Sequence, residues 1–407
     1  MFKLVTSLPE LCYGCGICKC ACPSNAIELL YNDNGFSHAV INTDKCDECN
    51  LCKNICPSYE WNVNFMKDKN DVKNSLLPFY EMFFAYSNND KIRYNGASGG
   101  CLTTILKYLF DTEKIDGVIS PYYYGPLKAE YKILNSLDEI LSQQKSKYFC
   151  IPFDIPLKEI QKYKNLAFIG LPCHLEAINK WKKLNKLIKY KFGLYCGHVQ
   201  NKNFYYHLGV NNETDQLHFR PGDWWNLDYF ITVNKKGKEK IYPFRNDQYI
   251  HKLITSRAFS RDGCLYCPDF MATKSDISFG DGWHNKWKDD KMGYNHIIIR
   301  TDTGKKLYKE LINKNLISFI PSDVKEFKKS SLYGGIVYKH YMAPKRVTYL
   351  KMKNENNFLK NVPLQIDNKY FDNFEKYLEI KKEINSDYMN RNISDKINKM
   401  HNLLRKE

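Results

Sequence analysis

Two cysteine runs decide the fold of this chain: Cys12-Tyr-Gly-Cys-Gly-Ile-Cys-Lys-Cys-Ala-Cys-Pro23 and Cys46-Asp-Glu-Cys-Asn-Leu-Cys-Lys-Asn-Ile-Cys-Pro57. Both have the spacing C-x2-C-x2-C-x3-C-P of bacterial ferredoxins with two 4Fe-4S clusters, in which the fourth cysteine of each run ligates the other cluster. We therefore expect one cluster on Cys12, Cys15, Cys18 and Cys56, and a second on Cys46, Cys49, Cys52 and Cys22. Zinc also binds paired C-x2-C segments, but zinc sites rarely show two identical four-cysteine runs that end in proline.

The segment between the two runs predicts a β-hairpin. Residues 26–31 and 36–41 are largely apolar, and they flank the turn sequence Asn32-Asp-Asn-Gly35. We expect residues 1–62 to form a two-cluster ferredoxin domain of the bacterial type.

The cysteine content favours redox or metal chemistry. The 407 residues include 15 cysteines, nine of them before residue 57, and Cys12 comes before an apolar signal-peptide region could form. No stretch approaches the roughly 18 uncharged apolar residues of a transmembrane helix. A cytoplasmic protein without a membrane span is therefore expected.

The formal net charge of +16 suits either nucleic acid or acidic electron carriers such as ferredoxin or flavodoxin. The lysines are scattered, and no basic arm is present, so nucleic-acid binding is not expected.

The rest of the chain predicts an α/β domain. A polar linker at 63–77 precedes it, and we expect the domain to span residues 78–345. Apolar runs at 82–86, 115–119, 166–169 and 192–195 predict strands, and the segments 100–111, 155–163, 174–184 and 246–257 predict helices. Residues 346–407 are rich in lysine and asparagine and predict a peripheral C-terminal helical extension. The overall class is α+β or α/β.

A glycine-rich segment precedes the predicted helix at 100–111. Gly96-Ala-Ser-Gly-Gly100 brings small residues to a helix N-terminus, where free N–H groups and the helix dipole suit a phosphate. An ordinary serine-capped helix after a glycine turn explains the same residues. The nearby Lys145-Ser-Lys-Tyr148 is compatible with a solvated face.

Four later cysteines lie beside glycine or proline: Cys173, Cys196, Cys264 and Cys267. Their number matches one tetrahedral-thiolate site, either a cluster or a zinc ion. Cys173 and Cys196 are also compatible with buried core residues. His174 and His198 adjoin these cysteines, and a lone histidine is more often a hydrogen-bonding residue than a proton donor.

Together these motifs resemble the coenzyme F420 hydrogenase/dehydrogenase beta-subunit family, in its form with an N-terminal two-cluster ferredoxin domain. The resemblance is carried by residues 97–100, 146–148, 170–174, 194–198, 264–267 and 275–283. It implies a mixed-sheet, flavin-binding α/β domain and a third 4Fe-4S cluster on the four later cysteines. It also implies FAD near Ser98, Gly99, Gly100, Thr103, Lys147, Tyr148, Gly280 and Asp281.

The family's chemistry implies electron transfer between clusters and flavin. The flavin would exchange hydride with a deazaflavin coenzyme or another small molecule, and many bacterial relatives lie in polysaccharide biosynthesis. The catalytic residues are unknown, with His174, His198 and Lys147 as candidates. Pro172-Cys-His174, Cys196-Gly-His198 and Gly280-Asp-Gly-Trp283 depart from the family pattern, so the substrate is not carried over.

Two other functions remain open at this point. One is an electron-transfer subunit that needs a redox partner subunit. The other is a structural or regulatory iron–sulfur protein that binds nucleic acid, although a two-cluster wire is superfluous in a structural site.

Overall fold

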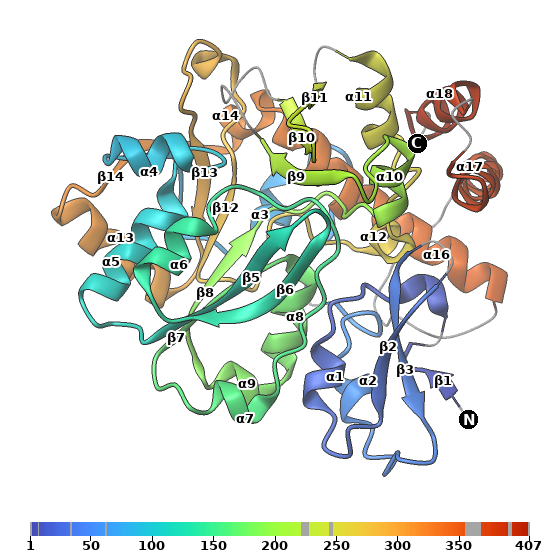
Figure 1. The fold of residues 1–407 in the computed structure, drawn as a ribbon, viewed down its shortest axis with the longest axis horizontal. Helices are drawn as coiled ribbons and strands as arrows, with labels where there is room; N and C mark the ends of the chain where they lie inside the picture. Colours follow the sequence, from blue (N-terminus) through green and yellow to red (C-terminus); the bar gives the residue numbers. More distant parts are fainter. Residues whose placement is uncertain are drawn as a thin grey trace.

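The computed structural model describes residues 2–6, 8–32, 35–61, 63–220, 228–243, 247–354, 368–389 and 393–405. Three sheets organise this part of the chain, and Figure 1 shows the N-terminal sheet (blue) beside the large sheet at the centre.

The N-terminal sheet is the predicted hairpin with one added strand. Its order is β1-β3-β2, all antiparallel, and Ile27 pairs with Ile41. The strands are β1 (Phe2–Leu4), β2 (Ile27–Tyr31) and β3 (Ser37–Asn42). Each cysteine run continues into a short helix, α1 (Ile17–Ala21) or α2 (Leu51–Ile55), and a 3-10 turn (Pro9–Leu11) precedes the first run. The hairpin prediction is confirmed, with residues 33–34 of its turn outside the described residues.

The large sheet has eight strands in the order β14-β4-β13-β12-β8-β7-β5-β6. The central neighbours β12, β8, β7 and β5 are parallel, and the flanking strands are antiparallel, so the predicted mixed sheet is confirmed. The strands are β4 (Glu81–Ser87), β5 (Gly117–Gly125), β6 (Lys128–Leu134), β7 (Leu166–Gly170), β8 (Ile188–Leu194), β12 (Ile277–Asp281), β13 (Asn295–Ile299) and β14 (Ile317–Pro321).

Helices cover both faces of this sheet because its central strands are apolar on both sides. Along β7, Leu166 and Phe168 join the core under α8, whereas Ala167 and Ile169 join the core under α5 and α13. The helices of this region are α4 (Asp90–Asn95), α5 (Cys101–Asp111), α6 (Leu137–Ser142), α7 (Leu157–Ile160), α8 (Pro172–Lys180), α9 (Lys182–Asn185) and α13 (Asp302–Asn313). The helix expected at 155–163 is thus only the short α7.

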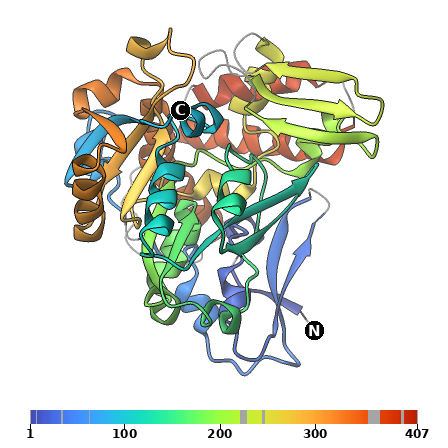
Figure 2. The ribbon, with the colours of Figure 1, turned by 60° about the vertical axis from the view of Figure 1, so that its left-hand side comes forward.

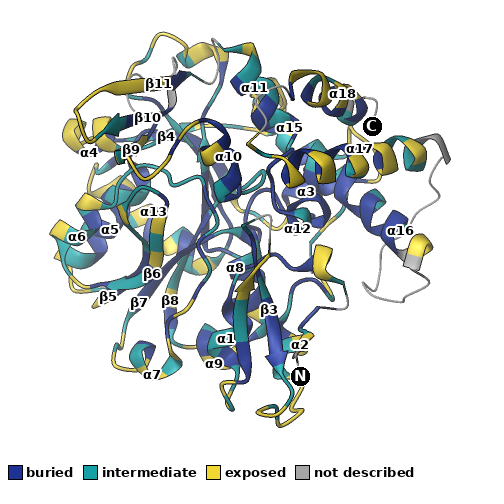
Figure 3. Ribbon diagram, turned by 45° about the vertical axis from the view of Figure 1, so that its right-hand side comes forward, coloured by how far each residue is buried: buried dark blue, intermediate teal, exposed yellow. Residues whose placement is uncertain are grey.

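The ferredoxin domain is packed directly onto the α/β domain. Helix α8 contacts both α1 and α2, and Figure 3 shows α8 and α12 within the buried interior. The Phe153 N–H donates to the Cys15 carbonyl at 2.8 Å, and the Trp61 indole N–H donates to the Tyr13 hydroxyl at 2.9 Å. Two parts that the sequence separates therefore share one core.

The segment expected as a polar linker at 63–77 is ordered and partly buried. It contains α3 (Val72–Leu76), whose Val72 and Leu76 side chains are fully buried in a core with Phe327 and Ile336. The linker expectation is therefore wrong for these residues.

The C-terminal helices complete the core of the molecule. The helical prediction for this segment is confirmed, but its peripheral character is wrong, because Phe374, Tyr377 and Met400 are fully buried. These helices lie against α10 and α11, beside the third sheet, whose order is β11-β10-β9 (Figures 1 and 2). The remaining elements are β9 (Thr214–Phe219), β10 (Asp228–Asn234), β11 (Glu239–Pro243), α10 (Lys202–His207), α11 (Gln248–Thr255), α12 (Asp262–Tyr266), a 3-10 turn (Asn285–Trp287), α14 (Val324–Lys329), α15 (Leu332–Ile336), a π-helical turn (Val337–Met342), α16 (Ala343–Asn354), α17 (Asn368–Ser386) and α18 (Ser394–Arg405).

Across the described ranges, none of the helices combines the length and the apolar character needed to span a bilayer.

Candidate functional site: a pocket between a helix start and four cysteines

A cavity opens at the carboxyl ends of the central parallel strands. Strands β7, β8 and β12 end at Gly170, Leu194 and Asp281, and residues from all three ends line a cavity of about 590 Å³. Open α/β sheets bind ligands in the crevice outside these strand ends. The volume falls within the range of roughly 300–1,000 Å³ that is usual for small-molecule and cofactor sites.

The start of α5 forms one wall of the pocket. Ala97, Ser98 and Gly100 line it, and Gly100 adopts a left-handed conformation with φ of 72° before the helix begins. Gly99 does not line the pocket. A Cβ there would lie 2.9 Å from the backbone of Ala85 and Asn295, so this glycine serves the packing of the turn against β4 and β13. The glycine-rich turn therefore shapes the wall without Gly99 facing a ligand.

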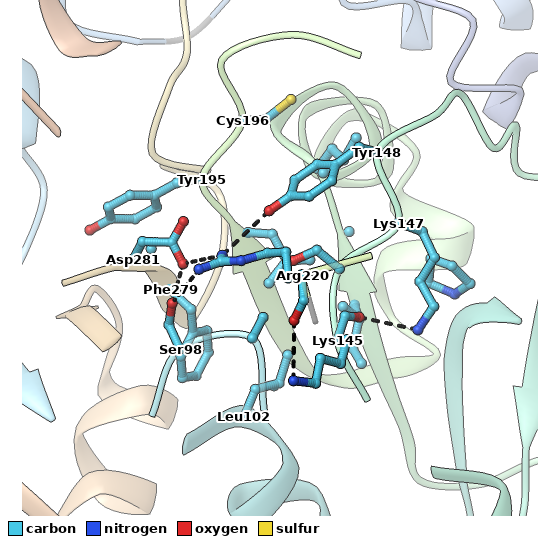
Figure 4. Close-up of a pocket in the computed structure, with 18 of the residues that line it drawn as sticks. Ser98, Leu102, Lys145, Lys147, Tyr148, Tyr195, Cys196, Arg220, Phe279 and Asp281 are labelled. Carbon is cyan, nitrogen blue, oxygen red and sulfur yellow. Dashed lines mark hydrogen bonds and ion pairs between the residues drawn. The ribbon is translucent and has the colours of Figure 1, made fainter. Parts of the chain in front are cut away.

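A buried ion pair lies beside the helix start. The Arg220 guanidinium is 2.7 Å from the Asp281 carboxylate, and the Ser98 hydroxyl donates to the same carboxylate (Figure 4). Arg220 also donates to the Tyr148 hydroxyl at 3.3 Å. Burial lowers the pKa of Arg220, but Asp281 and Tyr148 outweigh burial and raise it above its ordinary value. Arg220 thus brings a buried guanidinium, paired with Asp281, to a site where the sequence indicated Lys147 as the cation.

Lys147 and Thr103 line the pocket, and hydrogen bonds to the loop at residues 143–145 hold both in place. The Lys147 ammonium donates to the backbone carbonyls of Gln143, Gln144 and Lys145 at 2.5, 3.0 and 3.1 Å. The Thr103 hydroxyl accepts from the Gln144 amide at 3.3 Å. Burial lowers the pKa of Lys147 to about 8. Lys147 therefore fixes the loop at residues 143–145, and all three hydrogen bonds of its ammonium go to backbone carbonyls of this loop.

Gly280 is required by a close contact with an aromatic ring. A Cβ at this position would lie 2.0 Å from the ring of Tyr195, which lines the same pocket. The Tyr195 hydroxyl is 2.9 Å from Nδ1 of His296, a histidine that is fully buried. The glycine thus lets a tyrosine lie flat against β12 at the wall of the pocket.

Four cysteines lie near one another beside the pocket, and of these Cys196 lines it. Cys173 opens α8 after β7, Cys196 follows β8, and α12 carries Cys264 just before Cys267. Burial raises the pKa of Cys173, and the charges of Cys15, Cys267, Cys196 and Cys264 raise it further. Each of these thiols is thus within electrostatic reach of Cys173. Four converging thiols are the donor set that an iron–sulfur cluster requires.

The ferredoxin cysteines form two groups across the runs. Burial raises the pKa of Cys15, with further contributions from Cys56 and Cys12. Burial also raises the pKa of Cys52, with contributions from Cys22, Cys49 and Cys46. The charges thus group Cys56 with the first run and Cys22 with the second, and ligation across the runs stays a prediction that this grouping favours. No three His, Cys, Asp or Glu side chains are arranged to hold a metal ion anywhere in the described ranges.

The two candidate histidines are neutral at pH 7. Nδ1 of His174 accepts from the Leu171 N–H at 3.3 Å and lies 3.3 Å from the Tyr131 hydroxyl. Burial lowers the pKa of His174 to about 4, and burial with three nearby cations also lowers the pKa of His198. Both line the pocket, but neither holds the extra proton of a general acid.

Two buried cations near the cysteines were missed by the sequence. The Lys339 ammonium donates to the Cys264 carbonyl at 2.7 Å, and the side chain is 1% exposed. Arg261, also 1% exposed, donates to the Ser37 carbonyl at 2.7 Å and lies 3.2 Å from Sγ of Cys150. Lysine is so abundant in this chain that no local signal marks position 339.

The fold defines a protein with an N-terminal ferredoxin-like domain packed on an α/β domain with a mixed sheet. Residues 82–158 and 163–325 match the N-terminal and C-terminal parts of the coenzyme F420 hydrogenase/dehydrogenase beta subunit, and residues 11–59 match a 4Fe-4S dicluster domain. The chain belongs to the coenzyme F420 hydrogenase/dehydrogenase beta-subunit family, as its motifs indicated.

Three relatives come from methanogens. An uncharacterized protein of Methanocaldococcus jannaschii is 26% identical over 55% of this chain, and a coenzyme F420-dependent sulfite reductase of the same organism is 28% identical over 62%. The matches span 62% and 41% of these two relatives, so this chain covers less than two thirds of either. A coenzyme F420 hydrogenase subunit beta of Methanothermobacter thermautotrophicus is 24% identical over 60% of this chain and 86% of the relative.

A solved structure shares the fold. A chain of the F420-reducing NiFe hydrogenase complex from Methanosarcina barkeri superimposes with a TM-score of 0.53 and 18% identity. The match covers 70% of this chain and 96% of that one.

Proposed function

We propose that this protein is an iron–sulfur flavoenzyme that passes electrons between three 4Fe-4S clusters and FAD. A flavin held in the pocket would supply hydride exchange with a small molecule, for which the deazaflavin coenzyme F420 is the leading candidate. One observation carries the proposal: a single cavity reaches from the start of α5 to Cys196, so one bound cofactor touches both the anion-binding wall and a cluster ligand.

The order of the cysteines supports a continuous electron path. Cys49 is the exposed member of the eight ferredoxin cysteines, which favours the second cluster as the point of electron exchange with a partner. Cys15 of the first cluster lies within electrostatic reach of Cys173 of the third site. Cys196 belongs to the third site and lines the pocket. Electrons would thus cross the domain boundary without leaving the buried interior.

The pocket offers what FAD requires. The α5 N-terminus supplies N–H donors for phosphates beside Arg220, whose charge Asp281 offsets, and Leu102, Leu106 and Ile169 supply an apolar wall for the ring system. A bound flavin would supply the step between one-electron clusters and two-electron hydride chemistry. The protein's own groups position the flavin and exclude water from it.

The substrate assignment rests on the relatives. One acts with coenzyme F420 on sulfite and another is a subunit of an F420 hydrogenase, so a deazaflavin is favoured over a sugar-derived substrate of polysaccharide biosynthesis. Burial keeps His174 and His198 neutral, which removes both as imidazolium proton donors to that substrate.

A redox partner subunit is the second candidate role, favoured by the exposed Cys49 and by the similar chain found within a hydrogenase complex. The rim around Cys49 carries Asp47 and Glu48 as well as Lys45 and Lys53, all exposed. Because these four residues carry charges of both signs, the rim does not favour an acidic electron carrier over a partner subunit.

Cofactor analysis of anaerobically purified protein tests the proposal. We expect about one FAD and about twelve irons per chain, three clusters of four. Cys264→Ser should leave about eight irons, because it removes one ligand of the third site. A protein that holds eight irons before mutation, or no flavin, contradicts the proposal.

A matched pair of variants tests the pocket itself. Ala97→Trp should fill the cavity beside α5 and abolish flavin binding with all iron retained, because Ala97 lines the cavity and touches none of the cysteines. Tyr94→Trp changes an exposed ring nearby that does not line the cavity, and it should keep both cofactors. Stoichiometric flavin in Ala97→Trp would place the cofactor elsewhere.

A further inference from the structure

Among the described residues, the buried Lys339 ammonium forms no ion pair with a carboxylate, and buried Asp269 acts instead on Cys196 and Cys267. The charged or ionisable groups that act on it most are Cys267, Cys264, Cys196 and Tyr338. Burying an unpaired ammonium costs several kcal/mol, so such groups are retained beside a compensating negative charge. Neutral thiols supply no such charge, whereas a four-thiolate cluster does. The position of Lys339 therefore indicates an anionic group at these cysteines.

We propose that Lys339 is a positioning residue of the third cluster, holding the Cys264–Cys267 loop and raising the reduction potential of the cluster through its fixed positive charge. The inference rests on the proposed function, because it requires a cluster at the four cysteines. A cluster becomes more negative when it gains an electron, so a cation beside it stabilises the reduced state. The effect is strong because Lys339 is 1% exposed and water does not screen it.

A π-helical turn makes this placement possible. The turn Val337–Met342 presents Lys339 and His340 as consecutive buried residues, and such turns are rare and frequently occur at functional sites. Lys339 donates to the Cys264 carbonyl at 2.7 Å, and Nε2 of His340 accepts from the Phe270 N–H at 3.1 Å. Neighbouring side chains of one turn thus hold both ends of the segment that carries Cys264 and Cys267.

The same segment adds a third contact to this loop. Arg346, fully buried in α16, donates to the Leu265 carbonyl at 3.2 Å. Residues 337–346 lie beyond residue 325, where the match to the beta-subunit family ends. The cation beside the third cluster is therefore supplied by the part of the chain that the family match does not include.

Redox titration of the full-length protein, followed by EPR, tests the inference. The signal of the third cluster is the one that Cys264→Ser removes. Lys339→Met should shift the oxidised-to-reduced ratio of this cluster at least tenfold toward oxidised at a fixed potential, which is about 59 mV lower for a one-electron couple. The ferredoxin signals should stay unchanged. Lys345→Met, which removes a half-buried lysine from the same segment beside Tyr341, is the control and should leave all three signals in place.

Each outcome decides the inference. An unchanged third-cluster potential in Lys339→Met, with about twelve irons, overturns it while leaving the proposed function intact. Eight irons in the unmutated protein defeat the proposed function instead. If Lys339→Met loses four irons, Lys339→Arg is the deciding variant. Retained iron with a near-normal third-cluster potential in Lys339→Arg supports the role of the positive charge. Loss of iron in both variants overturns the inference.

Discussion

Arg261 connects the first cysteine run to the α/β domain through its guanidinium. Its Cζ atom lies 2.3 Å from where a Cβ on Gly14 would be, and its Nη2 lies 3.2 Å from Sγ of Cys150. Cys150 thus contributes a hydrogen-bond acceptor to the domain boundary. The buried guanidinium of Arg261 thus limits how closely the first cysteine run approaches the α/β domain.

Cys56 tests whether ligation crosses between the runs. Because its thiol groups with Cys12 and Cys15, Cys56→Ser should damage the first cluster and spare the second. Reduced-state EPR should then lose the coupling between two neighbouring ferredoxin clusters. Two intact, coupled clusters in Cys56→Ser would rule out the crossed arrangement.

His296 should make the stability of the protein depend on pH. Burial lowers its pKa to about 3, so the unfolded chain binds a proton more readily than the folded one. Its contribution to stability is complete above pH 6.5 and is lost as the pH falls toward 3. Between pH 7.5 and 5.5 this loss is about 1.4 kcal/mol.

Anaerobic chemical denaturation at the two pH values measures this effect. His296→Phe should reduce the stability difference between pH 7.5 and 5.5 by about that amount, whatever the variant's absolute stability. His218→Phe, on an exposed position of β9, is the control and should leave the difference as it is. An equal difference in His296→Phe and the unmutated protein would contradict the prediction.

The sequence indicated the cysteines but not the cations. Thiolate spacing is a local pattern, so eight ferredoxin positions can be proposed from two short runs. Arg220 and Lys339 act only through contacts with residues distant in the chain, Asp281 and Cys264. No pattern near either residue distinguishes it from a surface cation.

Helix α8 joins the two cofactor regions. Cys173 lies at its first turn, and near its end the Lys180 ammonium donates to the Glu60 carbonyl of the ferredoxin domain. The helix also contacts α1 and α2. One short rigid element therefore sets the separation between the first and third cysteine groups.

A glycine pair tests how tightly the first run is held. Gly16 and Gly237 both have left-handed backbone, with φ of 81° and 75°. A Cβ on Gly16 would lie 2.3 Å from the Phe153 carbonyl oxygen, whereas one on Gly237 would meet nothing within 4 Å. Gly237→Ala should thus cost about 1–2 kcal/mol of unfolding free energy.

Gly16→Ala should cost clearly more than Gly237→Ala, because the added methyl group also displaces the loop from Phe153. It should also release iron from the first cluster, which iron analysis and thermal denaturation of both variants would show. Equal destabilisation of the two variants would mean that the contact is not tight in solution.

The elements found from sequence are those with strong apolar runs. Strands β4, β5, β7 and β8 are buried and β-branched or aromatic, so they could be predicted. β12 and β13 were missed: β12 ends in Gly-Asp, and a loop with 3-10 structure separates it from β13. The third sheet was missed because β9 and β11 are short and mostly exposed, so neither carries an apolar run.

At the scale of the whole molecule, one core runs through regions that the sequence separates. Leu11 and Ile55 of the ferredoxin domain, Phe168 of the large sheet and Met400 of α18 belong to the same cluster of buried residues. The ferredoxin domain and the C-terminal helix α18 therefore pack into the same core as the large sheet.

The shared core predicts a single unfolding transition. Removing one part would expose apolar surface of the others, so partial unfolding is costly. Iron release, followed by absorbance, and tryptophan fluorescence should change together on anaerobic heating, since Trp61 lies at the boundary and Trp283 at the pocket. Two separated transitions would show that the ferredoxin domain folds independently.

The close approach of backbones at the first cysteine run limits how such proteins can recombine. At Gly14, Gly16 and Gly263, a single added methyl group would meet Arg261, Phe153 or the Cys12 carbonyl. A ferredoxin cassette taken from a relative would bring the right cysteine spacing, but it would fit only if its glycines met matching partners in the recipient. The ferredoxin domain and the surface of the α/β domain that it contacts are therefore expected to be inherited together.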